Sequence, residues 1–158
     1  TNYILTRMSE GDSFEAALKH AQDVGHAEAD PSLDVDGWDA ANKLVIIANS
    51  VLRHPTRLGD VQIVGIRGIT QRKMREANQA GKVIKLVAKG EKLAGGDWKL
   101  SVKPMQLSAE HPLARVAENM MGVIYHTDIN GTIMATIEER DPYPTAAAVL
   151  RDMVAVYH

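Results

Sequence analysis

The hydrophobic pattern of this chain changes its period near Val83, and that change limits the folds it can adopt. Before this point, apolar residues recur at helical spacing, as Phe14, Ala17 and Ala21 do. After it, the segments VIKLVAKGEK and DWKLSVKPMQLS alternate apolar and polar residues, which is typical of β-strands. Helices followed by antiparallel strands, with helices between the strands, predict an α+β fold.

Two turn signals organise the strands. Gly95-Gly96 between the alternating segments predicts one hairpin, and Asn130-Gly131 predicts a second. Pro104 suggests an edge or a bulge late in its strand, because proline cannot donate to a sheet ladder. We expect a mixed, largely antiparallel sheet of four to five strands with helices on one face.

Asp12 or Ser13 is predicted to cap the second helix, and Gly11, Gly25 and Gly81 are predicted to end three of the helices. The helix after the acidic loop is too apolar from Leu44 to Leu52 to lie on a surface. The last helix is expected to begin at Pro144 or Thr145 and to turn its apolar side inward, namely Ala148, Val149, Met153, Val156 and Tyr157. The expected ranges are 1–11, 13–25, 36–53, 70–81 and 144–157, with a short helix in HPLARVAE.

Composition excludes several functional classes. The chain has 158 residues, a net charge of −2 and no cysteine, which fits one domain over 1–158 and excludes disulfides, thiolate zinc sites and thiol nucleophiles. With this charge, nucleic acid is not expected as a partner. No signal peptide and no apolar run of about 18 residues is visible, so we expect a cytoplasmic protein without a membrane partner. The start at Thr1, inside a helical pattern, favours a fragment of a longer protein.

The segment from Gly25 to Lys43 is the main candidate for chemistry. It carries five carboxylates before its first basic residue, Lys43. Asp36 is predicted to cap the following helix, with Asp39 at the third helical position in an approximate capping box. Asp39 and Lys43 are four residues apart and therefore leave the same helix face. So many like charges favour a cationic or protic group among them.

Other interpretations of this segment differ in what they require. Ser32, Asp34 and Asp36 have the spacing of a calcium loop, but Lys43 falls where a bidentate glutamate is needed, so we reject calcium. Asp39 and Lys43 also fit a plain surface ion pair, although the apolar run after Lys43 favours a position lining a cleft. No HExxH, P-loop or GxGxxG pattern occurs, so no metal site and no phosphate-binding loop is expected.

Three stretches carry a resemblance to a known family. TNYILTRMSEG is followed by AQ-x-x-G-x-A-E-x-D-P and then by D-x-x-G-x-D-A-A-x-K, and together they resemble the catalytic region of homoserine dehydrogenase. The resemblance implies reversible reduction of aspartate 4-semialdehyde to homoserine with NAD or NADP. It also implies a homodimer formed through the sheet.

The resemblance implies roles for individual residues. Glu28 and Asp34 match the carboxylates that hold the substrate ammonium group, and Asp39 and Lys43 match the pair at the reacting oxygen. An α-amino acid needs a carboxylate for its ammonium group, and hydride transfer to a carbonyl needs a proton donor for the new alkoxide.

Thr1 and Asn2 match the end of a GT-x-N-Y segment that lies beside substrate and cofactor in the family. Two departures stand out. The nucleotide-binding Rossmann domain is absent from this chain, so cofactor-binding residues and a preference for NAD or NADP are not readable, and the fragment alone is expected to be inactive. The segment Glu138 to Pro142 replaces a Gly-Ala-Gly loop that approaches the cofactor.

Two other classes of function remain open from the sequence. One is a non-catalytic module that binds an amino acid or mediates dimerisation. The other is a metal-dependent hydrolase that uses the acidic segment, which would require a tightly held divalent ion.

Overall fold

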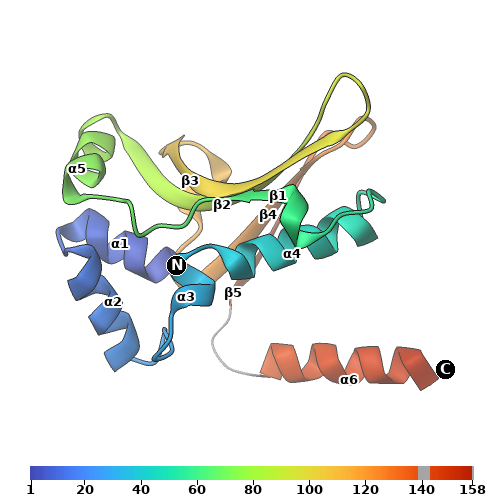
Figure 1. The fold of residues 1–158 in the computed structure, drawn as a ribbon, viewed down its shortest axis with the longest axis horizontal. Coiled ribbons are helices and arrows are strands. Elements are labelled where there is room, and N and C mark those ends of the chain that lie inside the picture. Colours follow the sequence, from blue (N-terminus) through green and yellow to red (C-terminus); the bar gives the residue numbers. More distant parts are fainter. Residues whose placement is uncertain (139–142, 158) are drawn as a thin grey trace. The chain divides into compact units, whose positions relative to one another are not determined.

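The computed structural model describes residues 1–138 and 143–157 and divides the chain into two compact units, Thr1–Arg115 and Val116–His158. The first unit contains helices and one sheet (Figure 1). Its elements in chain order are α1 (Asn2–Glu10), α2 (Phe14–Asp23), α3 (Ser32–Val35), α4 (Trp38–Ser50), the 3₁₀ turn η1 (Leu58–Asp60), β1 (Val61–Ile63), α5 (Gln71–Gln79), β2 (Lys82–Lys92), β3 (Trp98–Ser108) and the 3₁₀ turn η2 (Pro112–Arg115).

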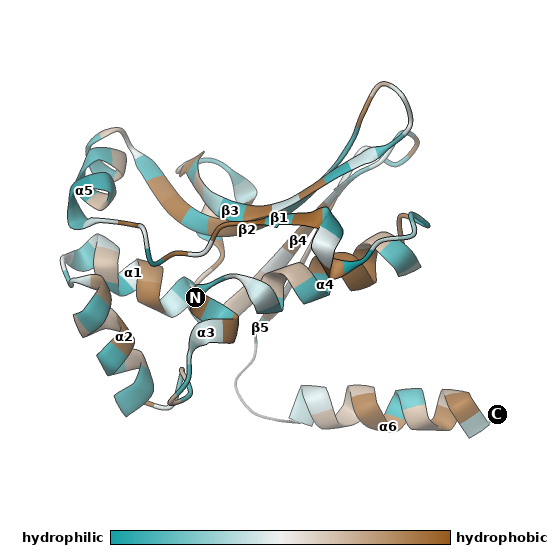
Figure 2. Cartoon of the chain, viewed as in Figure 1, coloured by the Kyte–Doolittle hydropathy of each residue, from teal (hydrophilic) through white to brown (hydrophobic). Residues whose placement is uncertain are grey.

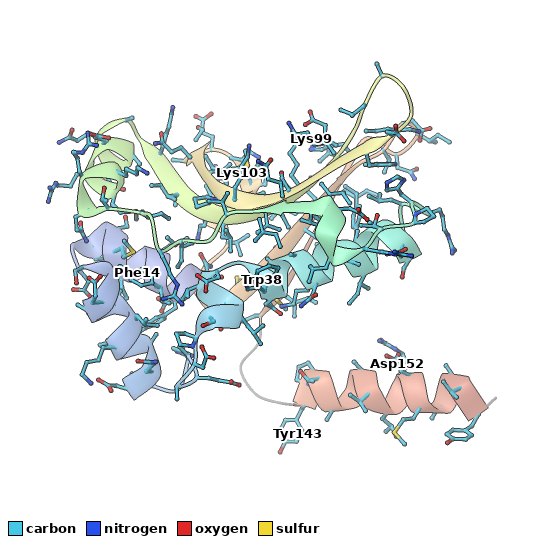
Figure 3. All side chains as sticks on the ribbon, viewed as in Figure 1. Phe14, Trp38, Lys99, Lys103, Tyr143 and Asp152 are labelled. Atoms are coloured by element: carbon cyan, nitrogen blue, oxygen red, sulfur yellow. The ribbon has the colours of Figure 1, made fainter. Side chains whose placement is uncertain are left out.

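The sheet of the first unit has three strands in the order β1-β3-β2. β2 and β3 form the predicted antiparallel hairpin, and β1 runs parallel to β3 with Val61 opposite Leu100. β1 pairs with β3 only as far as Val102, so Pro104 lies where β3 has no neighbour on the β1 side. This position suits proline, which has no N–H to donate to a neighbouring strand. Lys99 and Lys103 project from the sheet face opposite α4 (Figure 3).

Alternation along the strands places the apolar residues on the face that the helices cover. One buried cluster joins α1, α2, α5 and Ile84 of β2, and a second joins α4 to β1 and β3. Leu86 packs against both clusters and links them. α5 is mostly hydrophilic (Figure 2) and buries only Met74 and Ala77.

The predicted helix starts are confirmed at two positions. The Ser13 side chain accepts a hydrogen bond from the Ala16 amide before α2, and the Thr70 side chain accepts one from the Lys73 amide before α5. In both cases a hydroxyl satisfies an amide that the first helical turn leaves without a partner. The strand β1 that precedes α5 is short and covers only Val61–Ile63.

The second unit contains the hairpin of β4 (Met120–His126) and β5 (Thr132–Glu138) and the helix α6 (Tyr143–Tyr157). Gly131 has a φ of 68°, which explains the Asn-Gly turn between the strands. The prediction that α6 turns its apolar residues inward is wrong, because none of the residues described in α6 is buried. Val149, Met153, Val156 and Tyr157 are 56%, 54%, 79% and 84% exposed.

The α+β class is confirmed, whereas a single sheet of four to five strands is not. The described strands form a three-stranded and a two-stranded sheet, since alternation identifies strands but does not say which of them are neighbours. Within the described part of the chain, none of the helices has the length and apolar character needed to cross a membrane.

Candidate functional site

The acidic segment folds into a tight corner between α3 and α4, which we call the α3–α4 corner (residues 32–43). Asp36 ends α3, and Gly37 follows with a φ of 86° as the residue before α4. Trp38, at the start of α4, marks this corner in Figure 3. Only glycine adopts this left-handed conformation at little cost, so the direction change of the chain depends on Gly37.

The prediction that Asp36 caps α4 with Asp39 in a capping box is wrong. Gly37 occupies the capping position and no side chain caps the helix. The Asp36 carboxylate instead forms an ion pair with Arg67, with Arg67 Nε donating to Oδ1 at 2.5 Å and Nη2 to Oδ2 at 3.2 Å. A distant arginine competes successfully for this carboxylate because it offers two donors in one plane.

Gly65 allows the corner to approach the end of β1. A Cβ atom on Gly65 would lie 2.5 Å from the Asp36 Cα, closer than two carbon atoms can approach. The next residue, Ile66, donates its amide to the Val35 carbonyl at 2.7 Å. The corner is therefore fixed to the strand segment by main-chain contact as well as by the Arg67 ion pair.

Asp39 and Lys43 form the predicted ion pair on the first turns of α4. Lys43 Nζ lies 2.8 Å from Asp39 Oδ2, and the two side chains are 55% and 47% exposed. The opposite side of α4 buries Ala41, Leu44 and Ala48. Ile46 is 63% exposed, so the prediction that this helix is too apolar to lie on a surface is only half right.

The start of α1 belongs to the same neighbourhood. The side chains of Asp34, Asp39 and Lys43 lie close enough to the Thr1 nitrogen to act on it electrostatically. The structure thus brings together four of the predicted site residues from α1, α3 and α4.

Glu28 and Asn2 have different surroundings. Glu28 is exposed, and within the described ranges no hydrogen bond or ion pair joins its side chain to the other site residues. Asn2 accepts a hydrogen bond from Lys85 Nζ on β2 at 2.6 Å. Sequence reasoning missed Lys85, because alternation alone indicates only a polar position on a strand.

Two hollows of the first unit are lined by residues other than the predicted site residues. One, of about 350 Å³, is lined by Trp38, Leu58, Gly59, Val61 and Ile63. The other, of about 420 Å³, lies along β2, β3 and the 64–73 segment. Neither is lined by Asp39 or Lys43. Among the described residues, no group of three or more His, Cys, Asp or Glu side chains is placed to hold a metal ion.

The family model described as homoserine dehydrogenase matches residues 1–154. The chain belongs to the homoserine dehydrogenase family. The homoserine dehydrogenase of Methanocaldococcus jannaschii is 37% identical over 159 aligned residues, and that of Synechocystis is 41% identical over 160. The matches cover 100% and 99% of this chain, but only 46% and 37% of those proteins.

A crystal structure of S. aureus homoserine dehydrogenase at pH 7.0 matches with a TM-score of 0.91 and 36% identity. The match covers 99% of this chain and 40% of that one. Two other relatives are named with a cofactor: an NAD(+)-dependent homoserine dehydrogenase of Pseudomonas canavaninivorans, 32% identical, and a hyperthermophilic archaeal enzyme in complex with NADPH, with a TM-score of 0.77 and 29% identity. The chain thus spans less than half the length of these homoserine dehydrogenases.

The loop that departs from the homoserine dehydrogenase pattern lies mostly outside the described residues. Of the segment Glu138 to Pro142, which replaces a glycine loop, residues 139–142 lie outside the described residues.

Proposed function

We propose that this chain is the substrate-binding half of a homoserine dehydrogenase. The complete enzyme interconverts aspartate 4-semialdehyde and homoserine reversibly, with NAD or NADP. The observation that carries the proposal is the meeting of Thr1, Asp34, Asp39 and Lys43 in one neighbourhood of a chain that belongs to this family. The proposal places the protein in the biosynthesis of threonine, methionine and isoleucine, in the cytoplasm.

The nucleotide is held by another part of the polypeptide. This chain contains no GxGxxG or P-loop segment, the patterns that bring main-chain amides to a dinucleotide phosphate. The match to less than half of each relative supports a separate nucleotide-binding domain. When bound, the cofactor supplies or accepts the hydride, and the residues of this chain manage the substrate and its proton.

Lys43 acts at the reacting oxygen. Asp39, whose Oδ2 lies 2.8 Å from Lys43 Nζ, orients the ammonium group on the helix face. The Lys43 side chain is 55% exposed. It donates a hydrogen bond to the substrate carbonyl oxygen and delivers a proton as the alkoxide forms, and in the reverse direction it accepts the proton back.

Asp34 and Glu28 bind the substrate ammonium group. Asp34 lies in the α3–α4 corner close to Thr1, and Glu28 is an exposed carboxylate on the preceding loop. We assign Thr1 and Asn2 to substrate contact at the start of α1. Glu28→Ala is expected to weaken substrate affinity more than turnover, since an ammonium contact is present in both ground and transition states.

The decisive experiment compares this chain with the complete polypeptide that contains it. The complete protein should reduce NAD or NADP in the presence of homoserine, whereas the isolated chain should neither bind the nucleotide tightly nor turn over. Activity from this chain alone would overturn the need for a second half. A complete protein that binds homoserine by calorimetry but never reduces a nucleotide would instead support the amino-acid-binding module.

The proposal includes a homodimer that buries well over ~1,000 Å² in total, the usual lower limit for a biological interface. Apolar side chains exposed on β5, including Ile133 and Ile137 at 45% and 55%, support an assembly that covers them. Sedimentation at micromolar concentration tests this, and a monomer would contradict it.

A further inference from the structure

A glutamine from the stretch that carries the family resemblance has no role in the proposed function. Gln22 lies in the last turn of α2, within the AQ-x-x-G-x-A-E sequence. Its side-chain Nε2 donates to the Glu28 carbonyl oxygen at 3.0 Å and to the Ala29 carbonyl oxygen at 3.3 Å. A primary amide carries two N–H donors, which is enough for two carbonyls. We call these two hydrogen bonds the Gln22 clamp.

The clamp continues an attachment that the main chain begins. In the loop between α2 and α3 (Figure 1), the amides of His26 and Ala27 both donate to the Ala21 carbonyl, at 2.7 and 3.1 Å. These bonds fix the start of the loop to the end of α2. The Gln22 clamp extends this attachment to the main chain at Glu28, the residue that carries the carboxylate of interest.

The position of the main chain matters for a carboxylate such as that of Glu28. This residue is exposed and lies outside the helices and strands. Ordering a long side chain around a ligand costs conformational entropy, and a main chain that is also mobile adds to this cost. A main chain that is held before the substrate arrives reduces the cost, which is the general advantage of a preorganised site.

A ring contact ties the same loop to the start of α1. The His26 ring lies against the Tyr3 ring, with their centroids 4.8 Å apart. The Tyr3 hydroxyl in turn lies 2.7 Å from His20 Nδ1 on α2. Tyr3 follows Thr1 and Asn2, which the proposed function assigns to substrate contact. The loop that carries the ammonium-binding glutamate is thus held against α1 as well as α2.

We propose that Gln22 is a positioning residue of the dehydrogenase: its amide holds the main chain at Glu28, so that the Glu28 carboxylate is in place for the substrate ammonium group. This inference rests on the proposed function, in which Glu28 binds that ammonium group. Gln22 acts through Glu28 and touches no reacting atom in this assignment.

The first test uses the complete enzyme with Gln22→Met, which keeps the length of the side chain and removes both donors. KM for homoserine should rise about tenfold, as expected for the loss of one or two hydrogen bonds. kcat should stay within about twofold, because an ammonium contact is present in both ground and transition states. A KM that Gln22→Met leaves unchanged would overturn the proposal.

The matched control for this substitution is Gln71→Met. The Gln71 side-chain amide also donates to a main-chain carbonyl, that of Met8 at 3.2 Å. Both substitutions should lower the melting temperature by a similar small amount, whereas only Gln22→Met should raise KM. An equal rise of KM in the control would show a general loss of stability and would refute the positioning role.

Gln22→Glu separates position from charge. This substitution adds a carboxylate close to Glu28, which by Coulomb attraction alone would tighten the binding of an ammonium group. It also presents an acceptor to two carbonyl oxygens, so the clamp is lost and KM should rise at least as far as in Gln22→Met. A KM lowered by Gln22→Glu would mean that charge, rather than the position of Glu28, decides affinity, and would overturn the proposal.

A double-variant cycle tests whether Gln22 acts through Glu28. Gln22→Met should raise KM in the otherwise unchanged enzyme but should add little to the effect of Glu28→Ala, since no carboxylate is then left to position. Equal fold-changes in the two backgrounds would contradict the proposal.

Hydrogen exchange supplies a readout that does not depend on activity. Gln22→Met should speed exchange of the His26 and Ala27 amides about threefold to tenfold, and Gln71→Met should not. Unchanged exchange would refute the clamp whatever the kinetics show. Faster exchange in a complete protein that never turns over homoserine would refute the proposed function and leave Gln22 with a structural role in the loop.

Discussion

The apolar helices α4 and α6 differ in how far their side chains are buried. α4 contacts all three strands of its own sheet and buries Ala41, Leu44 and Ala48. α6, which contains hydrophobic stretches as well (Figure 2), leaves Leu150 63% and Val156 79% exposed. Exposed apolar side chains of this kind are typical of interaction surfaces. Apolar residues in a helix therefore predict that it packs against another surface. For α4 that surface is the three-stranded sheet of its own unit.

The largest expected effect concerns the ion pairs of these two helices. In the complete enzyme, Lys43→Ala should lower kcat about 10²–10⁴-fold, as expected for loss of a positioned acid or base. The matched control is Arg151→Ala, which removes the pair of Arg151 with Asp152 on α6, at 3.5 Å. The control should leave kcat within about twofold, because an exposed ion pair contributes little. Steady-state kinetics with homoserine measures both.

If Asp39 and Lys43 were only a surface pair, Lys43→Ala would behave like the control and would change the free energy of unfolding by under about 1 kcal/mol. Equal and small effects of the two substitutions would thus refute the catalytic assignment of Lys43.

The second prediction compares one leucine from each helix. Leu44 is 5% exposed and Leu150 is 63% exposed. Leu44→Ala should lower the free energy of unfolding by about 2–5 kcal/mol, the usual result of opening a cavity in a packed core. Leu150→Ala should change it by about 0.5 kcal/mol or less in the monomer. Urea titration of both variants gives the values, and a large loss at Leu150 would show that α6 packs against an apolar surface of its own chain.

A third, smaller effect tests how α4 is held in place. Gly65→Ala forces a methyl group onto the main chain of Asp36 and should cost about 1–3 kcal/mol, as overpacking does. It should also lower kcat/KM, because the α3–α4 corner carries Asp39. Gly95→Ala, where nothing lies within 4 Å, is the control and should be nearly neutral. A stable Gly65→Ala enzyme would show that the corner can move without loss.

The smallest effect is expected at the Asp36–Arg67 pair. Both side chains are partly exposed, at 35% and 48%, so Arg67→Ala should cost under about 1 kcal/mol at low salt and less at high salt. Thermal unfolding in 50 mM and in about 1 M NaCl checks this. A large, salt-independent loss would mean that Arg67, rather than Gly65, fixes the corner.

The sequence predicted the parts of the molecule that short spacings determine. Ser13 caps α2 because its hydroxyl acts within three residues, and Asp39 meets Lys43 one helical turn away. Contacts between distant segments were not predictable. Nothing local distinguishes Asp36 as the partner of Arg67, Gly65 as the site of a close main-chain approach, or Lys85 as the partner of Asn2. The roles assigned to the site residues remain predictions of the family resemblance.

The parallel pairing of β1 with β3 has a consequence for the order of folding. β2 and β3 are joined by a short turn and can zip up locally, but β1 must wait for a strand that follows both α5 and β2 in the chain. Bringing together segments so far apart in the chain costs more loop-closure entropy than closing a short turn, so these contacts form late. Since the α3–α4 corner rests on the residues just after β1, the candidate site is assembled late as well. On the ribosome, Asp39 and Lys43 therefore emerge early but take their final place only after β3 has been made.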